Sequence, residues 1–175
     1  MRRLSRALGL AALVGAALWA PATAAGGPAT TVLRLNGIGP LHLGMTRTAA
    51  VATGWLAGRS PGCPLSGTPP ITYRFTGAKA PHAIRGTAEF TDNRLTAMSF
   101  TRGVRTSTGV TVGRTTAARM VARYRAAGFT ASARFESTFQ GTFVRVRRHG
   151  HDVVGGFAQG RAVTIVAIPA VSVCE

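Results

Sequence analysis

Hydrophobic residues recur at helical spacing in two segments that lie 69 positions apart. In the later segment one side of a helix would carry Ala117, Met120, Val121, Tyr124 and Ala127, with Arg119 and Arg123 on the other. In the earlier segment the matching side would carry Thr48, Val51, Ala52, Trp55 and Gly58. The pattern predicts helices near Thr46–Ala57 and Thr115–Ala127, each capped by its first threonine, with Trp55 and Tyr124 at equivalent core positions.

Short runs of β-branched and apolar residues, bounded by turn-forming residues, predict strands in both halves. We expect them near Ile71–Thr76, Ile84–Thr91, Arg94–Arg102, Arg134–Phe139, Thr142–Arg148, Val153–Ala158 and Ala162–Ile168, with hairpin turns at Asp92-Asn93 and Gln159-Gly160. Alternation along Thr142–Arg148 places Phe143, Arg145 and Arg147 on one face and Val144 and Val146 on the other.

A helix followed by an antiparallel meander, written twice, predicts an α+β fold made of two tandem repeats. The first repeat would span residues 38–103 and the second residues 104–175, after a flexible segment at residues 25–37.

Residues 1–24 have the features of a secretory signal peptide. Arg2, Arg3 and Arg6 precede the uncharged apolar run Ala7–Ala20, and Ala22-Thr23-Ala24 forms a small-x-small cleavage site. The run is too short for a transmembrane helix, which needs about 20 apolar residues, and no later segment is long and apolar enough. We therefore expect a secreted, extracellular protein whose mature form has no membrane span; the alternative is an N-terminal anchor.

The chain contains two cysteines, Cys63 and Cys174. Outside the cytosol two thiols in one small chain usually form a disulfide, so we expect these two to be bonded. The alternatives are two free thiols or a metal pair, but neither cysteine has a neighbouring cysteine or histidine, as zinc sites require.

Two short motifs repeat along the chain and carry a resemblance to a known fold. Leu41-His42-Leu43-Gly44-Met45-Thr46 matches Val110-Thr111-Val112-Gly113-Arg114-Thr115, and Phe90-x-x-Asn-Arg matches Phe157-x-x-Gly-Arg. This pattern resembles the tandem repeats of β-lactamase inhibitory proteins and of small outer-membrane-assembly lipoproteins, of a type found in secreted proteins of GC-rich, actinobacterial-type Gram-positive bacteria. The resemblance implies a non-catalytic protein that holds or blocks other proteins, and no binding residue is carried over from it.

The chain carries 21 Lys+Arg against 5 Asp+Glu, a net charge of +16. Almost all of the basic residues are arginine, which GC-rich codons favour, so composition alone can explain much of this excess. A functional interpretation is a surface that binds anions. Arg145 and Arg147 would form it, together with Arg148, His149 and His151 at the end of the same strand. A larger anion platform would result if Arg119 and Arg123 lay beside them. The alternative is a solvated face. Aromatic residues that would stack on bases are missing apart from Phe143, which disfavours nucleic acid.

The most site-like cluster is His149-Gly150-His151-Asp152, in which two imidazoles and a carboxylate could share a metal. A polar hairpin tip is the simpler interpretation, and we expect no metal and no cofactor. The sequence has no Gly-x-Ser-x-Gly elbow and no phosphate-binding glycine loop.

These observations favour a secreted, non-catalytic protein-binding module, either inhibitor-like or associated with the cell envelope. The alternative is an extracellular binder of anionic polymers through an arginine-rich sheet face, and a hydrolase is a distant third. We expect the partner to be an extracellular protein or an anionic cell-envelope polymer.

Overall fold

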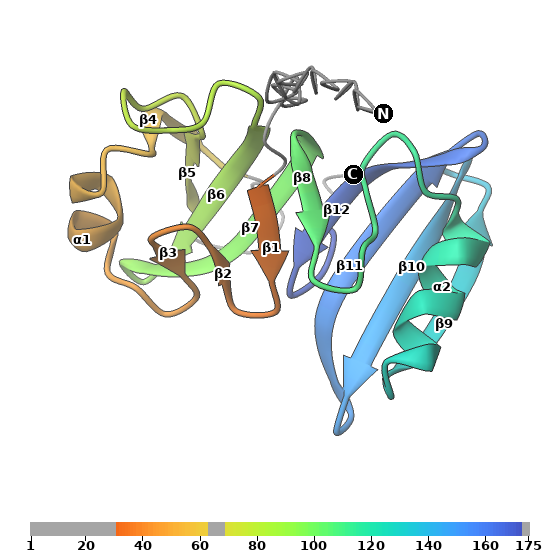
Figure 1. The fold of residues 1–175 in the computed structure, drawn as a ribbon. Helices are drawn as coiled ribbons and strands as arrows, with labels where there is room; N and C mark the ends of the chain where they lie inside the picture. Colours follow the sequence, from red (N-terminus) through yellow and green to blue (C-terminus); the bar gives the residue numbers. More distant parts are fainter. Residues whose placement is uncertain (1–30, 63–68, 173–175) are drawn as a thin grey trace, which may run out of the picture.

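A computed structural model describes residues 31–62 and 69–172. Two helices interrupt successive runs of strands, and each half of the chain contributes one helix (Figure 1). In chain order the elements are β1 (Thr31–Arg34), β2 (Gly37–Ile38), β3 (Leu41–His42), α1 (Arg47–Ala52), β4 (Ala57–Pro61), β5 (Ile71–Arg74), β6 (Arg85–Thr91), β7 (Arg94–Arg102), β8 (Val104–Thr106), α2 (Ala117–Ala126), β9 (Thr130–Glu136), β10 (Gly141–Arg148), β11 (His151–Gln159) and β12 (Ala162–Ile168).

The strands form one large sheet and one small sheet. The large sheet has eight strands in the order β4-β5-β6-β7-β12-β11-β10-β9, all antiparallel. We call β4–β7 the first half-sheet and β9–β12 the second; they join where β7 pairs with β12, with Phe100 opposite Val166. The small sheet has the order β3-β2-β1-β8 and contains the parallel pair β1 and β8.

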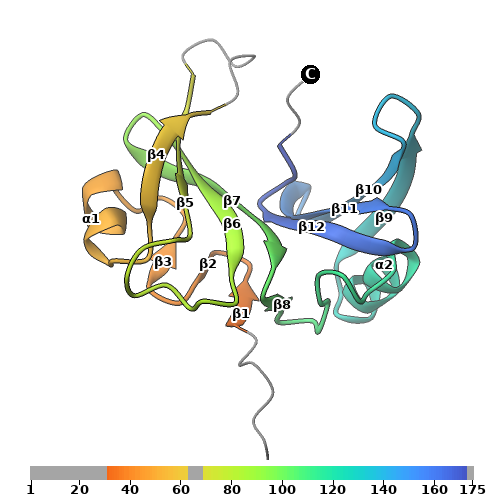
Figure 2. The same ribbon diagram turned by 90° about the horizontal axis from the view of Figure 1, so that it is seen from above.

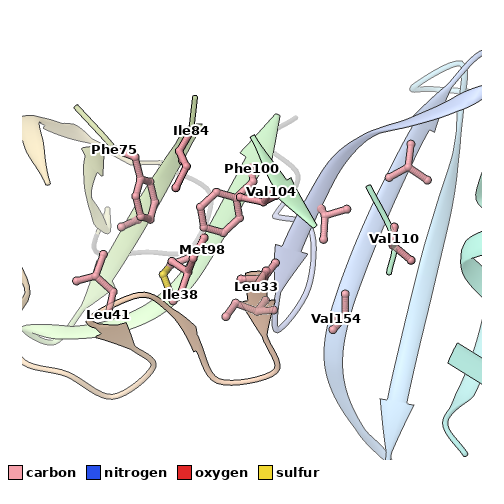
Figure 3. Packing of buried hydrophobic residues seen from close by; sticks show 14 of the residues in the cluster. Leu33, Ile38, Leu41, Phe75, Ile84, Met98, Phe100, Val104, Val110 and Val154 are labelled. Carbon is pink, nitrogen blue, oxygen red and sulfur yellow. The ribbon is translucent and has the colours of Figure 1, made fainter. Parts of the chain in front are cut away.

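The back of the large sheet is covered differently in its two halves. Behind the first half-sheet the small sheet supplies Leu33, Ile38 and Leu41, which pack with Phe75, Met98 and Phe100 (Figure 3). Behind the second half-sheet lies α2 (Figure 2). Its Met120 and Tyr124 are fully buried.

We call the opposite side of the large sheet its open face. The C-terminal segment that follows β12 lies on this side, between the two half-sheets (Figure 2).

Two adjacent glycines in β11 show how closely the layers pack on both sides. A Cβ at Gly156 would lie 2.7 Å from the Met120 Sδ atom of α2, whereas a Cβ at Gly155 would collide with the backbone of Ala170 and Val171. Glycine at these positions therefore lets α2 approach the back and lets the C-terminal segment lie on the open face.

The predicted α+β class is wrong. Of the described residues 51% lie in strands and 12% in helices, and there are two helices among them, so the molecule is mostly β. Strands from both halves also join in one continuous sheet, and β8 of the second half pairs with β1 of the first. The small sheet covers the back of the first half-sheet, where the sequence pattern predicted that the earlier helix would pack.

The earlier predicted helix is too long. Thr46 caps α1 as expected, because its hydroxyl accepts from the Ala49 N–H, but the helix ends at Ala52 and Gly54 follows with φ of +75°. Only Ala50 of α1 is buried, and Val51 is exposed. Trp55 therefore lies beyond the helix and is partly buried, so it is not equivalent to Tyr124.

The later helix agrees closely with the prediction, except at its cap. Thr116 is the residue whose hydroxyl accepts from the Arg119 N–H, while the Thr115 hydroxyl accepts from the Thr111 N–H in the preceding turn. The two capping residues, Thr46 and Thr116, are therefore 70 residues apart, one more than the 69-residue offset of the sequence motifs.

One expectation about the N-terminal segment is wrong, and two other predictions concern residues that the structure does not describe. Residues 31–37, which we expected to be flexible, form β1 and the start of β2, and Leu33 is in the core. The predicted signal peptide and both Cys63 and Cys174 lie outside the described residues, so secretion and the disulfide stay predictions. Within residues 31–62 and 69–172 no helix has the length and hydropathy needed to cross a membrane.

Candidate functional site

Arg145 and Arg147 lie on the open face of β10, as the alternation predicted. Val144 and Val146 between them are buried on the α2 side. Asp152 of β11 lies directly opposite Arg147, and its Oδ1 atom accepts from Arg147 Nε at 3.0 Å. The same oxygen is 3.6 Å from Arg145 Nε, so one carboxylate serves both guanidinium groups. This sharing lowers the positive charge that the two arginines present to a ligand.

A second ion pair lies on the neighbouring strand β9. Arg134 Nε is 3.0 Å from Glu136 Oε1, and Arg134 is directly opposite Phe143 of β10. The open face of β9–β11 therefore carries three arginines and two carboxylates, all of them in ion pairs.

Three phenylalanines pack beside these charges. The rings of Phe143 and Phe157, directly opposite each other on β10 and β11, have centroids 4.8 Å apart, and the Phe139 ring meets Phe143 edge-on at 5.5 Å. All three are only partly buried. Gly141 leaves the space that the Phe157 ring occupies, since a Cβ there would collide with it. The result is an apolar patch that reaches solvent on the open face.

A hollow of about 440 Å³ connects the patch with the ion pairs. Its floor and walls include Ser132, Arg134, Phe139, Phe143, Arg145 and Asp152, and the C-terminal segment contributes Ala170 and Val171. We call these residues, together with Phe157 and Glu136, the aromatic surface. It combines an apolar centre with charged groups around it.

The other predicted binding residues are not part of this surface. Arg148 lies on the opposite side of β10, where its guanidinium sits 5.9 Å from the centre of the Phe129 ring. His151 is directly opposite Arg148 and shares that side. His149 forms the tight turn with Gly150 and has φ of +50°. The predicted set of five therefore divides between two faces and a turn.

The second arginine pair also lies apart from Arg145 and Arg147. Arg119 and Arg123 belong to α2, which packs against the back of the second half-sheet. Arg123 Nη1 donates to the Gly109 carbonyl and is partly buried. Because the sheet separates the two pairs, the continuous platform considered from the sequence does not form.

The His149-Gly150-His151-Asp152 cluster is a hairpin tip, which is the simpler of the two interpretations. The Asp152 carboxylate is turned toward the arginines of β10. Across residues 31–62 and 69–172 no three His, Cys, Asp or Glu side chains are grouped so that they could hold a metal ion.

Comparison of the chain with protein-family models, with curated proteins and with solved structures gives no match. The open face must therefore be interpreted from its own geometry.

Sequence reasoning found Arg145, Arg147 and Phe143 on one face but missed Phe139 and Phe157 as surface residues. Phe139 was expected to end a strand, whereas it lies in the turn between β9 and β10. The alternation of β11 was obscured by Gly155 and Gly156, and by a register shift between Phe157 and Ala158. The directly opposed positions of Phe143 and Phe157 become visible only once the strands are paired.

Proposed function

We propose that this protein acts without catalysis and binds another protein through the aromatic surface of β9–β11. The single observation that carries the proposal is the partly exposed group Phe139, Phe143 and Phe157, set beside ion-paired arginines on an open sheet face. Aromatic residues and arginine are enriched where proteins bind one another, and binding energy concentrates in an apolar centre with a polar rim.

The charge arrangement favours a protein over an anionic polymer. A polymer bound by counterion release needs arginines whose charge is available, and affinity then falls steeply with salt. Asp152 serves both Arg145 and Arg147, and Glu136 pairs with Arg134, so this surface has an excess of one positive charge. The ion pairs also hold the arginine side chains in position, which reduces the entropy lost when a partner binds.

The predicted signal peptide supports a secreted location, so the partner is expected outside the cytosol, free or attached to the cell envelope.

The test is capture of partners from the culture supernatant and cell wall of the source organism, followed by affinity measurement with the captured partner. Phe143→Ala is expected to weaken binding by more than about 1 kcal/mol, and Arg145→Ser with Arg147→Ser by about the same amount. Phe135→Ala is the matched control, because Phe135 is 60% exposed but lies on the other face of β9. It should leave the affinity unchanged.

Three results would overturn the proposal. The first is that Phe143→Ala binds as well as the unaltered protein. The second is that binding is lost steeply between about 50 and 200 mM salt, as for a polyanion. The third is turnover of a cell-wall or ester substrate that disappears when His149 or His151 is replaced, which would make the protein an enzyme.

A further inference from the structure

A second hollow lies on the open face of the first half-sheet. It has a volume of about 370 Å³ and is lined by Arg74, Arg85, Thr87, Ser99 and Thr101, with Val171 and Ser172 of the C-terminal segment at its side. Arg74, Thr87 and Ser99 form one row across β5, β6 and β7, since Thr87 is directly opposite both of the others. Arg85 precedes Thr87 by two residues and shares its face.

The two arginines of this hollow have no acidic partner among the described residues. Arg74 makes no ion pair or side-chain hydrogen bond there, and the three ion pairs of the described chain are all in the second half-sheet. Arg85 is a diagonal neighbour of Arg74 on the adjacent strand, and such neighbours have Cα atoms about 7–8 Å apart, so both side chains can reach one bound anion. Glu89 is the diagonal neighbour of Arg74 on the other side, and the two form no ion pair.

Arg85 is held in position by the protein. Its Nη1 atom donates to the carbonyl oxygens of His82 at 2.7 Å and of Ile84 at 2.8 Å. Both bonds use the same nitrogen, which leaves Nε and Nη2 to donate elsewhere. A guanidinium fixed in this way loses little freedom when it binds a ligand with two oxygens.

The floor of the hollow supplies hydroxyl groups. Thr87 Oγ1 and Ser99 Oγ are 3.2 Å apart, so one donates to the other and the accepting hydroxyl keeps its own proton for a ligand. The acidic residue on the same face of β6 is Glu89, two positions beyond Thr87. It lies opposite Thr72 and Ala97 and does not line the hollow.

From this arrangement we infer that the first half-sheet binds an oxyanion, a carboxylate or phosphate group, between Arg74 and Arg85 with Thr87 and Ser99 as additional donors. The site goes beyond the proposed function because it uses a different hollow, and none of its four donor residues belongs to the aromatic surface; Val171 of the C-terminal segment lines both hollows. The guanidinium groups provide charge and paired N–H donors, and the hydroxyls orient the remaining oxygens.

The test is a titration of the ¹⁵N-labelled protein with inorganic phosphate and, separately, with acetate, at constant ionic strength set by sodium chloride. We expect saturable changes in the amide resonances of Thr87, Ser99 and Thr101. Replacing Arg74→Gln and Arg85→Gln together should weaken binding at least about tenfold, the effect of losing charge-assisted hydrogen bonds. Arg119→Gln is the matched control, on an exposed α2 position behind the other half-sheet.

Saturation by phosphate alone supports a phosphate-bearing ligand, and saturation by acetate supports a carboxylate ligand. Changes that do not saturate, or that spread equally over all arginine-rich surfaces, would overturn the inference. Thr87→Val provides a second variant that keeps strand propensity and removes one donor; unaltered affinity in both variants would also overturn it. Phe143 does not take part in this site. A negative anion titration therefore leaves the proposed partner binding untouched, and a failure of partner binding leaves the anion site untouched.

Discussion

The two half-sheets have the same number of strands but differ in what covers their backs. The second half-sheet is backed by α2, a ten-residue helix with two large buried side chains, Met120 and Tyr124. The first is backed by the small sheet, while the six-residue α1 buries only Ala50. Short strands with well-placed apolar residues therefore do for one half-sheet what a helix does for the other.

The open faces differ in a corresponding way. The second half-sheet has three partly exposed phenylalanines, and each of its arginines there has a carboxylate partner. In the first half-sheet the hollow is lined by hydroxyl groups and two arginines without a carboxylate. The net charge of the chain does not describe either surface, because the few acidic residues decide locally which arginines are available to a ligand.

The largest expected difference between the two halves is in the free energy of unfolding lost when Tyr124 or Trp55 is replaced. Tyr124 is fully buried, so Tyr124→Ala should lower the free energy of unfolding by about 3–5 kcal/mol. Trp55 is partly exposed, and its ring packs over Gly39, so Trp55→Ala should lower it by less. Urea unfolding of the two variants measures the difference. Equal losses would show that the two positions are energetically equivalent despite their different burial.

Tyr124→Phe is the control that separates the ring from its hydroxyl. The hydroxyl is buried without a hydrogen-bond partner of good geometry among the described residues, although Thr106 and Thr108 lie near it. Burial raises the pKa of Tyr124, and the two threonine hydroxyls lower it by a smaller amount. Since little hydrogen bonding is lost, Tyr124→Phe should change the free energy of unfolding by less than about 1 kcal/mol.

Sequence patterns located most strands of the large sheet. The predicted limits of Arg94–Arg102 and Ala162–Ile168 are confirmed, and Asp92 and Asn93 form a turn in which both residues have positive φ. These elements are marked by β-branched or apolar runs next to turn-specific residues, signals that act locally and are readable without knowing the partner strand. The face assigned to Arg145 and Arg147 is confirmed because Thr142–Arg148 alternates, which is also a local signal.

The predictions were wrong or incomplete where pairing between segments distant in the sequence determines the structure. The pattern Thr46–Ala57 looked helical, but Gly54 ends α1, and the core behind the first half-sheet is filled from β1–β3 instead. These strands have two to four residues, too few for periodicity to be recognised. The aromatic surface was likewise incomplete, because Phe157 joins Phe143 only through the β10–β11 register.

A substitution with a smaller expected effect would give the second half-sheet arginines without a carboxylate partner, as in the first. Asp152→Asn removes the carboxylate shared by Arg145 and Arg147. Because both arginines are substantially exposed, the free energy of unfolding should fall by less than about 1 kcal/mol. The freed guanidinium groups should then bind inorganic phosphate, with new saturable shifts in the amides of β10. Titration at low and moderate salt measures this gain.

Glu136→Gln is the comparison variant, since it frees a single arginine, Arg134. It should add less phosphate affinity than Asp152→Asn. If neither variant binds phosphate more tightly than the unaltered protein, then pairing with acids is not what distinguishes the two half-sheets.

The smallest expected effect concerns Glu89 on the open face of the first half-sheet. Burial raises the pKa of this carboxyl above its ordinary value of 4.5, so the folded protein keeps the Glu89 proton to higher pH than the unfolded chain does. Stability from this group therefore falls as the pH rises from 4.5 through the raised pKa, and above that range the ionised carboxylate is a constant cost. Glu89→Gln should consequently be slightly more stable than the unaltered protein near neutral pH, and the difference should disappear below pH 4.5. Urea unfolding at several pH values measures both quantities. A loss of stability near neutral pH would instead mean that the ionised carboxylate helps to balance the arginines of the first half-sheet, and the contrast between the two open faces would then be weaker.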